Sequence, residues 1–276
     1  MIKRIASTVI LWLVLGGALW TFGTTGALVL IAVISGLTLR ELYHLLGASG
    51  TAPFSRLGIF FGTLITLEPW LQARFGLPGH GLLALATVVF AVRILSEREP
   101  DRRLDALAST VFGLVYVGFL LSYLVRIVTP LPGDLLSPTA RLILCLWVVA
   151  VAKFCDVGAL LTGLAFGRTK MAPTISPKKT WEGLAGGLVV SMGVGAGVAW
   201  LARSVMPAGM DPLHAAFKAL PIAAIAVVSD LIESVVKRKA AIKDSGAAIP
   251  GIGGIFDLSD SLLLAAPVAY FILRLP

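Results

Sequence analysis

The sequence has little charge, little cysteine and little histidine. Only 14% of its 276 residues are Asp, Glu, Lys or Arg, whereas soluble globular domains have about a quarter. The two cysteines, Cys145 and Cys155, lie in one apolar segment and would be roughly 15 Å apart on a helix, which excludes a disulfide between them. The histidines (His44, His80 and His214) are scattered and lack the spacing of metal ligands. The scarcity of charge excludes an ordinary soluble domain.

Apolar residues take the place of the missing charge. They make up 57% of the chain, and the mean hydropathy is +0.92. Long apolar runs such as LVLIAVISGL, without the alternating polarity of barrel strands, favour helices over a β-barrel. We therefore expect an all-α, polytopic integral membrane protein with about nine transmembrane helices. The expected spans are about 5–21, 24–40, 57–72, 79–95, 108–128, 141–165, 184–203, 214–236 and 258–275, of which the second and third are short enough to be re-entrant.

The formal net charge of the chain is +8. Its basic residues recur in short clusters between apolar segments, which indicates loops that face anionic lipid or an anionic substrate, with no nucleic acid as partner. If the N-terminus is cytoplasmic, sixteen of the 23 Lys and Arg residues lie in cytoplasmic segments. The positive-inside rule thus supports nine spans, with the N-terminus inside and the C-terminus outside. We expect a multi-pass protein of the cell's inner (plasma) membrane. A homodimer in the lipid bilayer is left open.

Region 229–261 has the densest charge. It holds five of the fifteen carboxylates: Asp230, Glu233, Asp244, Asp257 and Asp260. Asp230 and Glu233, three residues apart, share a helix face at the end of one expected span. Asp257 and Asp260 do the same at the start of the next, and the Gly- and Pro-rich segment between the pairs would bring them together. Such acids repel one another unless a cation binds, and oxygen-only ligands favour Mg²⁺. The alternative is a solvated loop with capping aspartates.

A second charged region covers residues 153–187. Lys153 and Asp156 share a helix face, either as a structural ion pair or with Asp156 pointing into a polar cavity. Hydroxyls and lysines then alternate around two prolines, which favours a cradle for a polyphosphate over a plain topological loop. The residues of this cradle are Arg168, Lys170, Ser176, Lys178, Lys179 and Thr180. Glycines at positions 183, 186, 187, 193 and 197 predict close helix packing in the following span.

Two blocks of the chain together resemble one known family. The segment SVVKRKAAIKDSGAAIPGIGGIFDLSDS (234–261) is similar to the signature of the phosphatidate cytidylyltransferases, also called CDP-diacylglycerol synthases. The segment DVGALLTGLAFGRTKMAPTISPKKTWEG (156–183) is similar to that family's second block. The family commonly has His where Ile252 stands, Arg where Leu258 stands and often Tyr where Leu160 stands. These departures put in doubt any role for that His and Arg.

The resemblance implies a nucleotidyltransferase that converts CTP and phosphatidic acid to CDP-diacylglycerol and pyrophosphate. It implies Mg²⁺ as cofactor, with a second cation left open. The expected organisation is a set of N-terminal transmembrane helices (1–140) and a C-terminal transmembrane catalytic region (141–276) whose site faces the cytoplasm.

The residues implied fall into three groups. The catalytic residues are Asp230, Asp257, Lys243 and Asp244. The substrate-binding residues are Lys170, Ser176, Lys178, Lys179, Thr180, Lys237, Arg238 and Ser245. The metal ligands are Asp230 and Asp257, with Glu233, Asp260 and Asp156 in supporting positions.

Other activities can be weighed against this one. A CTP-dependent lipid kinase would use the same nucleotide and cation but would release CDP in place of pyrophosphate. A polytopic transporter would place its charges near the bilayer midplane in repeated halves, and the sequence has no visible repeat. A CDP-alcohol phosphotransferase is disfavoured because the expected acidic spacing is missing: the pair here is Asp257-x-x-Asp260.

Overall fold

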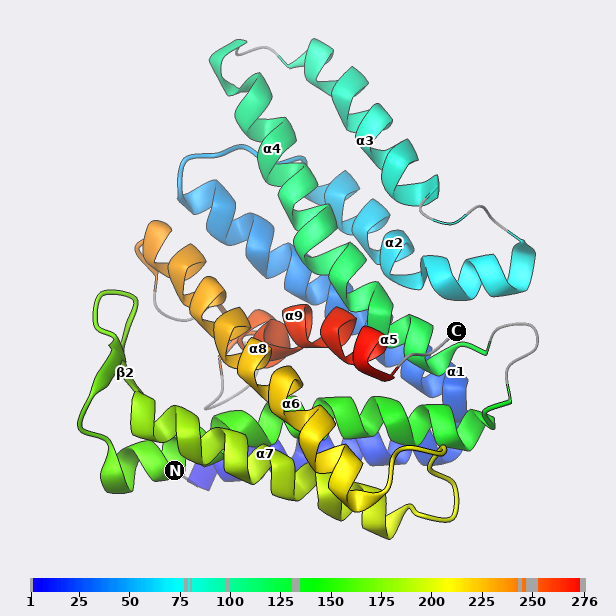
Figure 1. The fold of residues 1–276 in the computed structure, drawn as a ribbon. Helices are drawn as coiled ribbons and strands as arrows, with labels where there is room; N and C mark the ends of the chain where they lie inside the picture. Colours follow the sequence, from blue (N-terminus) through cyan, green and yellow to red (C-terminus); the bar gives the residue numbers. More distant parts are fainter. Residues whose placement is uncertain are drawn as a thin grey trace. The chain divides into compact units, whose positions relative to one another are not determined.

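The computed structural model describes the chain apart from residues 1, 77, 78, 80, 98, 99, 131–134, 243, 244, 247–252 and 274–276, and gives only the backbone for residues 2–9 and 11. The described part is nearly all helical (Figure 1). The α-helices are α1 (Ile2–Ala48), α2 (Ser55–Phe75), α3 (Gly81–Arg93), α4 (Arg103–Gly113), α5 (Leu120–Val128), α6 (Pro138–Phe166), α7 (Trp181–Leu201), α8 (Pro212–Lys239) and α9 (Ile255–Leu273). Two short 3₁₀ turns, η1 (Ile94–Ser96) and η2 (Pro100–Arg102), precede α4, and a π-helical turn, η3 (Leu114–Phe119), joins α4 to α5.

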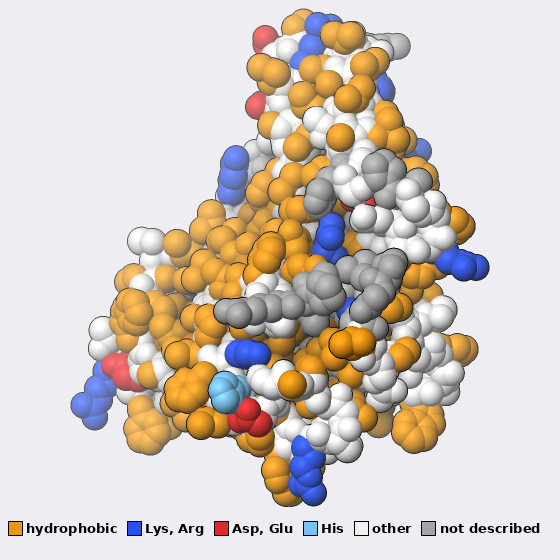
Figure 2. Space-filling view, turned by 45° about the vertical axis from the view of Figure 1, so that its right-hand side comes forward, with side chains coloured by type: hydrophobic (Ala, Val, Ile, Leu, Met, Phe, Trp, Pro, Cys, Tyr) orange, Lys and Arg blue, Asp and Glu red, His pale blue; other side chains and the backbone are white. Residues whose placement is uncertain are grey.

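Six helical segments within the described residues are long and apolar enough to cross a membrane. They are Trp12–Ala48, Pro100–Val128, Pro138–Phe166, Trp181–Leu201, Pro212–Lys239 and Ile255–Leu273. Hydrophobic side chains cover much of the face seen in Figure 2, as expected where lipid replaces water. The helical membrane class is therefore confirmed, but the predicted count of nine spans is not.

The difference in count begins in α1, which contains both of the first two predicted spans. Gly23 interrupts this helix with a positive φ of 54° and a ψ of −132°. Only glycine adopts such a conformation without strain. The predicted boundary between spans 5–21 and 24–40 therefore falls at the kink, although the chain turns there within one long helix.

The chain forms two compact units. The first comprises Met1–Thr129 and Val236–Ser259, and the second comprises Pro130–Val235 and Asp260–Pro276. This division by packing differs from the predicted regions 1–140 and 141–276, which were defined by spans and site residues. In the first unit, Tyr43 of α1 is buried and donates a hydrogen bond to the carbonyl of Thr110 in α4 (2.9 Å).

In the second unit, α6 and α7 lie side by side (Figure 1). A Cβ added at Gly187 would lie 2.7 Å from the carbonyl oxygen of Cys155, and one at Gly183 would lie 2.8 Å from that of Ala159. The two backbones therefore approach too closely for any side chain, as the sequence predicted for these positions and for Gly186. Among the described residues a Cβ at position 193 or 197 would meet nothing within 4 Å, so the prediction was wrong there.

A short hairpin precedes α7, where the sequence predicted only a loop. Strand β1 (Lys170–Ala172) pairs antiparallel with β2 (Ser176–Thr180), with Lys170 opposite Thr180. Glu182, in the first turn of α7, accepts the backbone N–H groups of Arg168 and Thr169 at 3.2 and 3.1 Å. The hairpin is thus fastened to the helix that follows it.

Candidate metal and phosphate site

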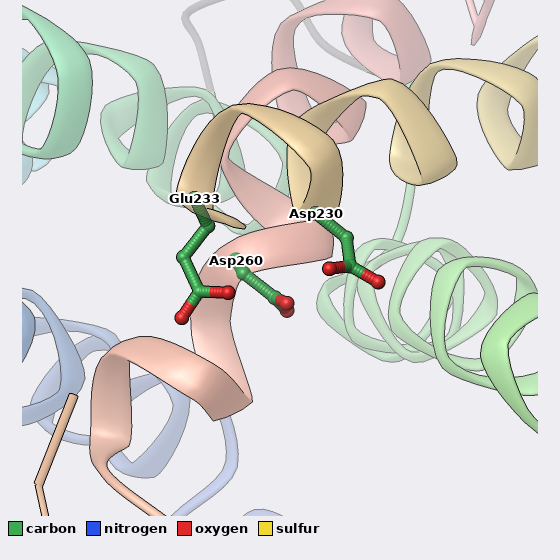
Figure 3. A group of neighbouring side chains, drawn as sticks. All are labelled: Asp230, Glu233 and Asp260. Atoms are coloured by element: carbon green, nitrogen blue, oxygen red, sulfur yellow. The ribbon is translucent and has the colours of Figure 1, made fainter. Parts of the chain in front are cut away.

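Three carboxylates from two helices meet in the second unit. Asp230 and Glu233 come from α8 and Asp260 from α9, and ligand oxygens of the three lie within 4.8 Å of one another (Figure 3). Glu233 is 1% exposed and Asp260 6% exposed. The Ser229 hydroxyl fastens the two helices, because it donates to the carbonyl of Asp260 and accepts the N–H of Leu264 (3.3 Å).

Two lysines neutralise part of this acidic group. Lys179 of β2 places its Nζ 2.6 Å from Oδ2 of Asp230. Lys153 of α6 places its Nζ 3.3 Å from Oδ1 of Asp260 and donates to the hydroxyl of Ser261 at 2.6 Å. The direct ion pair of Lys153 is therefore with α9, and Asp156, its predicted partner, contributes a smaller electrostatic attraction.

The donor set fits a hard divalent cation. Asp156 interacts electrostatically with Asp230, Asp260 and both lysines, so it adds a fourth carboxylate to the three that meet here. Buried like charges repel strongly, and removing them from water is costly unless a cation compensates. All the candidate ligand atoms are carboxylate oxygens, which are what Mg²⁺ takes in proteins. Asp230, Glu233 and Asp260 are the residues that could hold it.

Asp257, predicted as a principal metal ligand with Asp230, is held by a different set of contacts in the first unit. Its Oδ1 lies 2.7 Å from Nζ of Lys237. Its Oδ2 accepts the backbone N–H of Gly254 (2.7 Å) and the hydroxyl of Ser245 (2.9 Å). The group of three carboxylates therefore does not include Asp257, and its role as a metal ligand stays a prediction.

Glu41 is a residue that the sequence reasoning missed. It lies in α1, and its carboxylate accepts the N–H groups of Ile255 (3.0 Å) and Phe256 (2.8 Å) and the hydroxyl of Ser245 (2.9 Å). One signal was available: Glu41 is the first carboxylate in the sequence, with the next at Glu68. An isolated acid next to an apolar span indicates a specific partner.

The remaining predicted site residues have varied surroundings. On the hairpin, Lys170 and Lys178 are exposed, Ser176 is half-buried and Thr180 is buried. Arg238, at the end of α8, is exposed. Lys243 and Asp244 lie outside the described residues, as does Ile252, which stands where the family commonly has His.

Three carboxylates of two long apolar helices thus gather with lysines of α6 and β2, an arrangement of charges typical of enzymes that act on phosphate compounds. The chain belongs to the cytidylyltransferase family, whose model matches residues 2–275. It is therefore a nucleotidyltransferase, as the sequence resemblance implied.

Similar proteins include several named phosphatidate cytidylyltransferases. The chain is 33% identical to phosphatidate cytidylyltransferase 5, chloroplastic, of Arabidopsis thaliana, over 94% of this chain and 67% of that protein. It is 32% identical to phosphatidate cytidylyltransferase of Synechocystis sp., over 96% of this chain and 92% of that protein. The match to the Mycobacterium bovis phosphatidate cytidylyltransferase, at 34% identity, covers 64% of this chain and 54% of that longer protein.

Proposed function

We propose that this protein transfers CMP from CTP to phosphatidic acid, giving CDP-diacylglycerol and pyrophosphate. The family and the names of its relatives support the reaction class and both substrates. The single structural observation that carries the proposal is the group of Asp230, Glu233 and Asp260, paired with lysines within apolar helices. That arrangement suits the chemistry of two polyanions meeting at a membrane.

In this reaction a phosphate oxygen of phosphatidic acid forms a bond to the α-phosphorus of CTP. The bond from that phosphorus to the bridging oxygen of the β-phosphate breaks, and pyrophosphate leaves with the electron pair. Bound Mg²⁺ supplies positive charge that neutralises the phosphates and stabilises the leaving group. A phosphate monoester loses its second proton with a pKa of about 6, so the nucleophile is already ionised near neutral pH and needs no dedicated base.

The chain's own residues bind and orient the reactants. Asp230, Glu233 and Asp260 would hold the cation through their carboxylate oxygens. Lys179 carries a positive charge beside Asp230, where the phosphates of CTP would approach the cation. Lys170 and Lys178, exposed on the same hairpin, are placed to attract the nucleotide from solution.

We further propose that the site opens to the cytoplasm of a bacterial-type inner membrane, with the N-terminus inside. The positive-inside distribution of Lys and Arg supports this orientation. The kink at Gly23 separates two helical segments within α1, as the first two of the nine predicted spans require. Phosphatidic acid would then reach the site laterally from the cytoplasmic leaflet.

The deciding experiment is an assay of the purified protein in liposomes that contain phosphatidic acid, with CTP labelled in the cytidine. We expect Mg²⁺-dependent formation of a labelled liponucleotide and one pyrophosphate for each liponucleotide. A folded wild-type protein that forms no liponucleotide would contradict the proposal. Release of CDP, with phosphorylation of added diacylglycerol, would identify a lipid kinase instead.

A further inference from the structure

We propose that Glu41 is a positioning residue for the reaction: it fixes Ser245 and the first turn of α9, and thereby sets the orientation of Asp257. The inference rests on the proposed function and on the predicted part of Asp257 in that reaction, and all of its contacts lie within the first unit. Glu41 lies 204 to 215 residues from its partners in sequence. The link is therefore purely tertiary, between α1 and the segment that leads into α9.

Both oxygens of Glu41 accept backbone groups of α9. Oε1 accepts the N–H of Ile255 and Oε2 that of Phe256, while the preceding N–H, of Gly254, is accepted by Asp257. The first N–H groups of a helix have no partner within the helix, and a carboxylate near them is favoured by the helix dipole. Glu41 and Asp257 together therefore determine where α9 begins.

Ser245 connects the two carboxylates. Its hydroxyl lies 2.9 Å from Oε2 of Glu41 and 2.9 Å from Oδ2 of Asp257. A hydroxyl has one proton, so Ser245 donates it to only one of the two carboxylates at a time. The backbone N–H of Ser245 donates to Oδ2 of Asp257 in either case (3.2 Å). Because Lys237 holds the other oxygen of Asp257, the orientation of that carboxylate is fixed from both sides.

The backbone at Gly246 and Gly254 packs closely against the carboxylate of Glu41. A Cβ at Gly246 would lie 2.7 Å from Oε1 of Glu41, and one at Gly254 would collide with Oε2 of Glu41 and Oγ of Ser245. Main chain therefore packs directly against the carboxylate. Catalysis is sensitive to displacements of about 1 Å in groups that position the reactants. A contact this close is thus suited to transmit the position of α1 to Asp257.

Glu41→Gln tests the role without changing side-chain volume. N–H donors lie against both oxygens of Glu41, so either orientation of the amide places its NH₂ group against an N–H. Glu68→Gln is the matched control, because Glu68 of α2 is also buried and accepts the N–H of Leu82 at the start of α3 through Oε1 (2.9 Å). Within the described residues the other oxygen of Glu68 accepts no N–H, so the NH₂ group of glutamine can take its place.

Two readouts separate positioning from simple capping. Hydrogen–deuterium exchange of the Ile255 and Phe256 amides reports the contact itself, and steady-state kinetics report its consequence. In Glu41→Gln we expect exchange about tenfold faster or more. We expect kcat to fall on the order of 100-fold, with the KM for CTP changed less than about threefold, because the lysines on the hairpin are untouched. Glu68→Gln should leave both readouts at the wild-type values.

Ser245→Ala provides a second test that does not depend on the folding of Glu41→Gln. It removes the hydroxyl that joins the two carboxylates but leaves the contacts of Glu41 with α9. Protection of the Ile255 and Phe256 amides should persist while kcat falls about tenfold or more.

Each contrary result has a distinct meaning. If the exchange rates of the Ile255 and Phe256 amides are unchanged in Glu41→Gln, Glu41 does not protect them and the inference is wrong. If exchange is faster but kcat stays at the wild-type value, Glu41 only caps α9 and does not position Asp257 for the reaction. If Glu41→Gln does not fold, a wild-type kcat in Ser245→Ala overturns the inference. A wild-type protein without cytidylyl transfer would contradict the proposed function, and the exchange measurement would still decide whether Glu41 holds α9.

Discussion

At the scale of single residues, the carboxylates in α8 and α9 account for the positions of two lysines, which form ion pairs with them. Each buried carboxylate in a bilayer needs compensation, and Lys153 and Lys179 reach Asp260 and Asp230 from elements outside α8 and α9. Glu233 and Asp156 add two more carboxylates to the same group. A group of carboxylates this close together is the kind of site at which we propose that a cation binds.

Glu233→Gln should therefore abolish Mg²⁺ binding without unfolding the protein. Removing one like charge relieves repulsion, so without Mg²⁺ the variant should be at least as stable as the wild type. With Mg²⁺, the wild type should gain thermal stability and the variant should not, because only a bound ligand stabilises the folded state. Turnover should fall about 100-fold or more. Thermal unfolding with and without Mg²⁺ measures the first effect and the liponucleotide assay the second.

The control for this variant is Asp105→Asn, which removes an exposed carboxylate at the start of α4. It should change neither the Mg²⁺-dependent stability nor the turnover. If Glu233→Gln were stabilised by Mg²⁺ as strongly as the wild type, Glu233 would not be a ligand.

At the scale of secondary-structure elements, the packing of α6 on α7 depends on which glycines face the partner helix. Gly187 faces α6, where the carbonyl of Cys155 and the side chain of Ala159 leave no space. Gly193 faces open space among the described residues. Two glycines of the same helix therefore have opposite consequences when a methyl group is added.

Gly187→Ala should destabilise the protein by about 1–3 kcal/mol, because the two helices must move apart to admit the methyl group. Gly193→Ala should leave stability unchanged or raise it by up to about 1 kcal/mol, since alanine favours the helical state. Thermal unfolding in the same detergent compares the two directly. Equal destabilisation of both variants would show that helix packing at Gly187 is not the cause.

The hairpin and α7 meet at Thr180, whose hydroxyl accepts the N–H of Gly183 (3.1 Å) as the N-cap of the helix. Thr180→Ala should cost about 1 kcal/mol of stability, and Thr180→Ser should retain most of it. Because Thr180 is buried, we expect the KM for CTP to change little in either variant. A large rise in KM for Thr180→Ala alone, without loss of stability, would indicate instead that the hydroxyl binds the nucleotide.

What the sequence could predict was mostly local. The pairing of Asp230 with Glu233 follows from a spacing of three on one helix, and the structure keeps both in the acidic group. Glu41 could not be assigned, because its partners are more than two hundred residues away and no local pattern marks them. The hairpin was missed because its strands have only three and five residues, and because Glu182 of the next helix holds the backbone just before them.

The glycine pattern shows the same limit at the level of a helix face. Spacing alone identified the seventh span as rich in small residues. Which side of α7 packs on α6 depends on the tertiary structure and cannot be read from spacing. Close packing was therefore predicted correctly for Gly187 and wrongly for Gly193.

At the scale of the whole molecule, the spanning helices must place the hairpin on one side of the bilayer. Helix α7 has 21 residues, which at 1.5 Å per residue is about 32 Å, close to the roughly 30 Å of a hydrocarbon core. The hairpin precedes α7 and the turn that begins at Ala202 follows it. These two segments should therefore lie on opposite faces of the membrane.

Single cysteines at the two ends of α7 test this topology and the orientation together. Thr174, in the hairpin turn, and Ser204, after α7, are both exposed, whereas the native Cys145 and Cys155 are buried in α6. With a membrane-impermeant maleimide, Thr174→Cys should be labelled only in inverted vesicles and Ser204→Cys only in right-side-out vesicles. The wild type should stay unlabelled in both. The reverse pattern would place the acidic site on the outer face and contradict the cytoplasmic orientation, and labelling of both variants from one side would mean that α7 does not cross the bilayer.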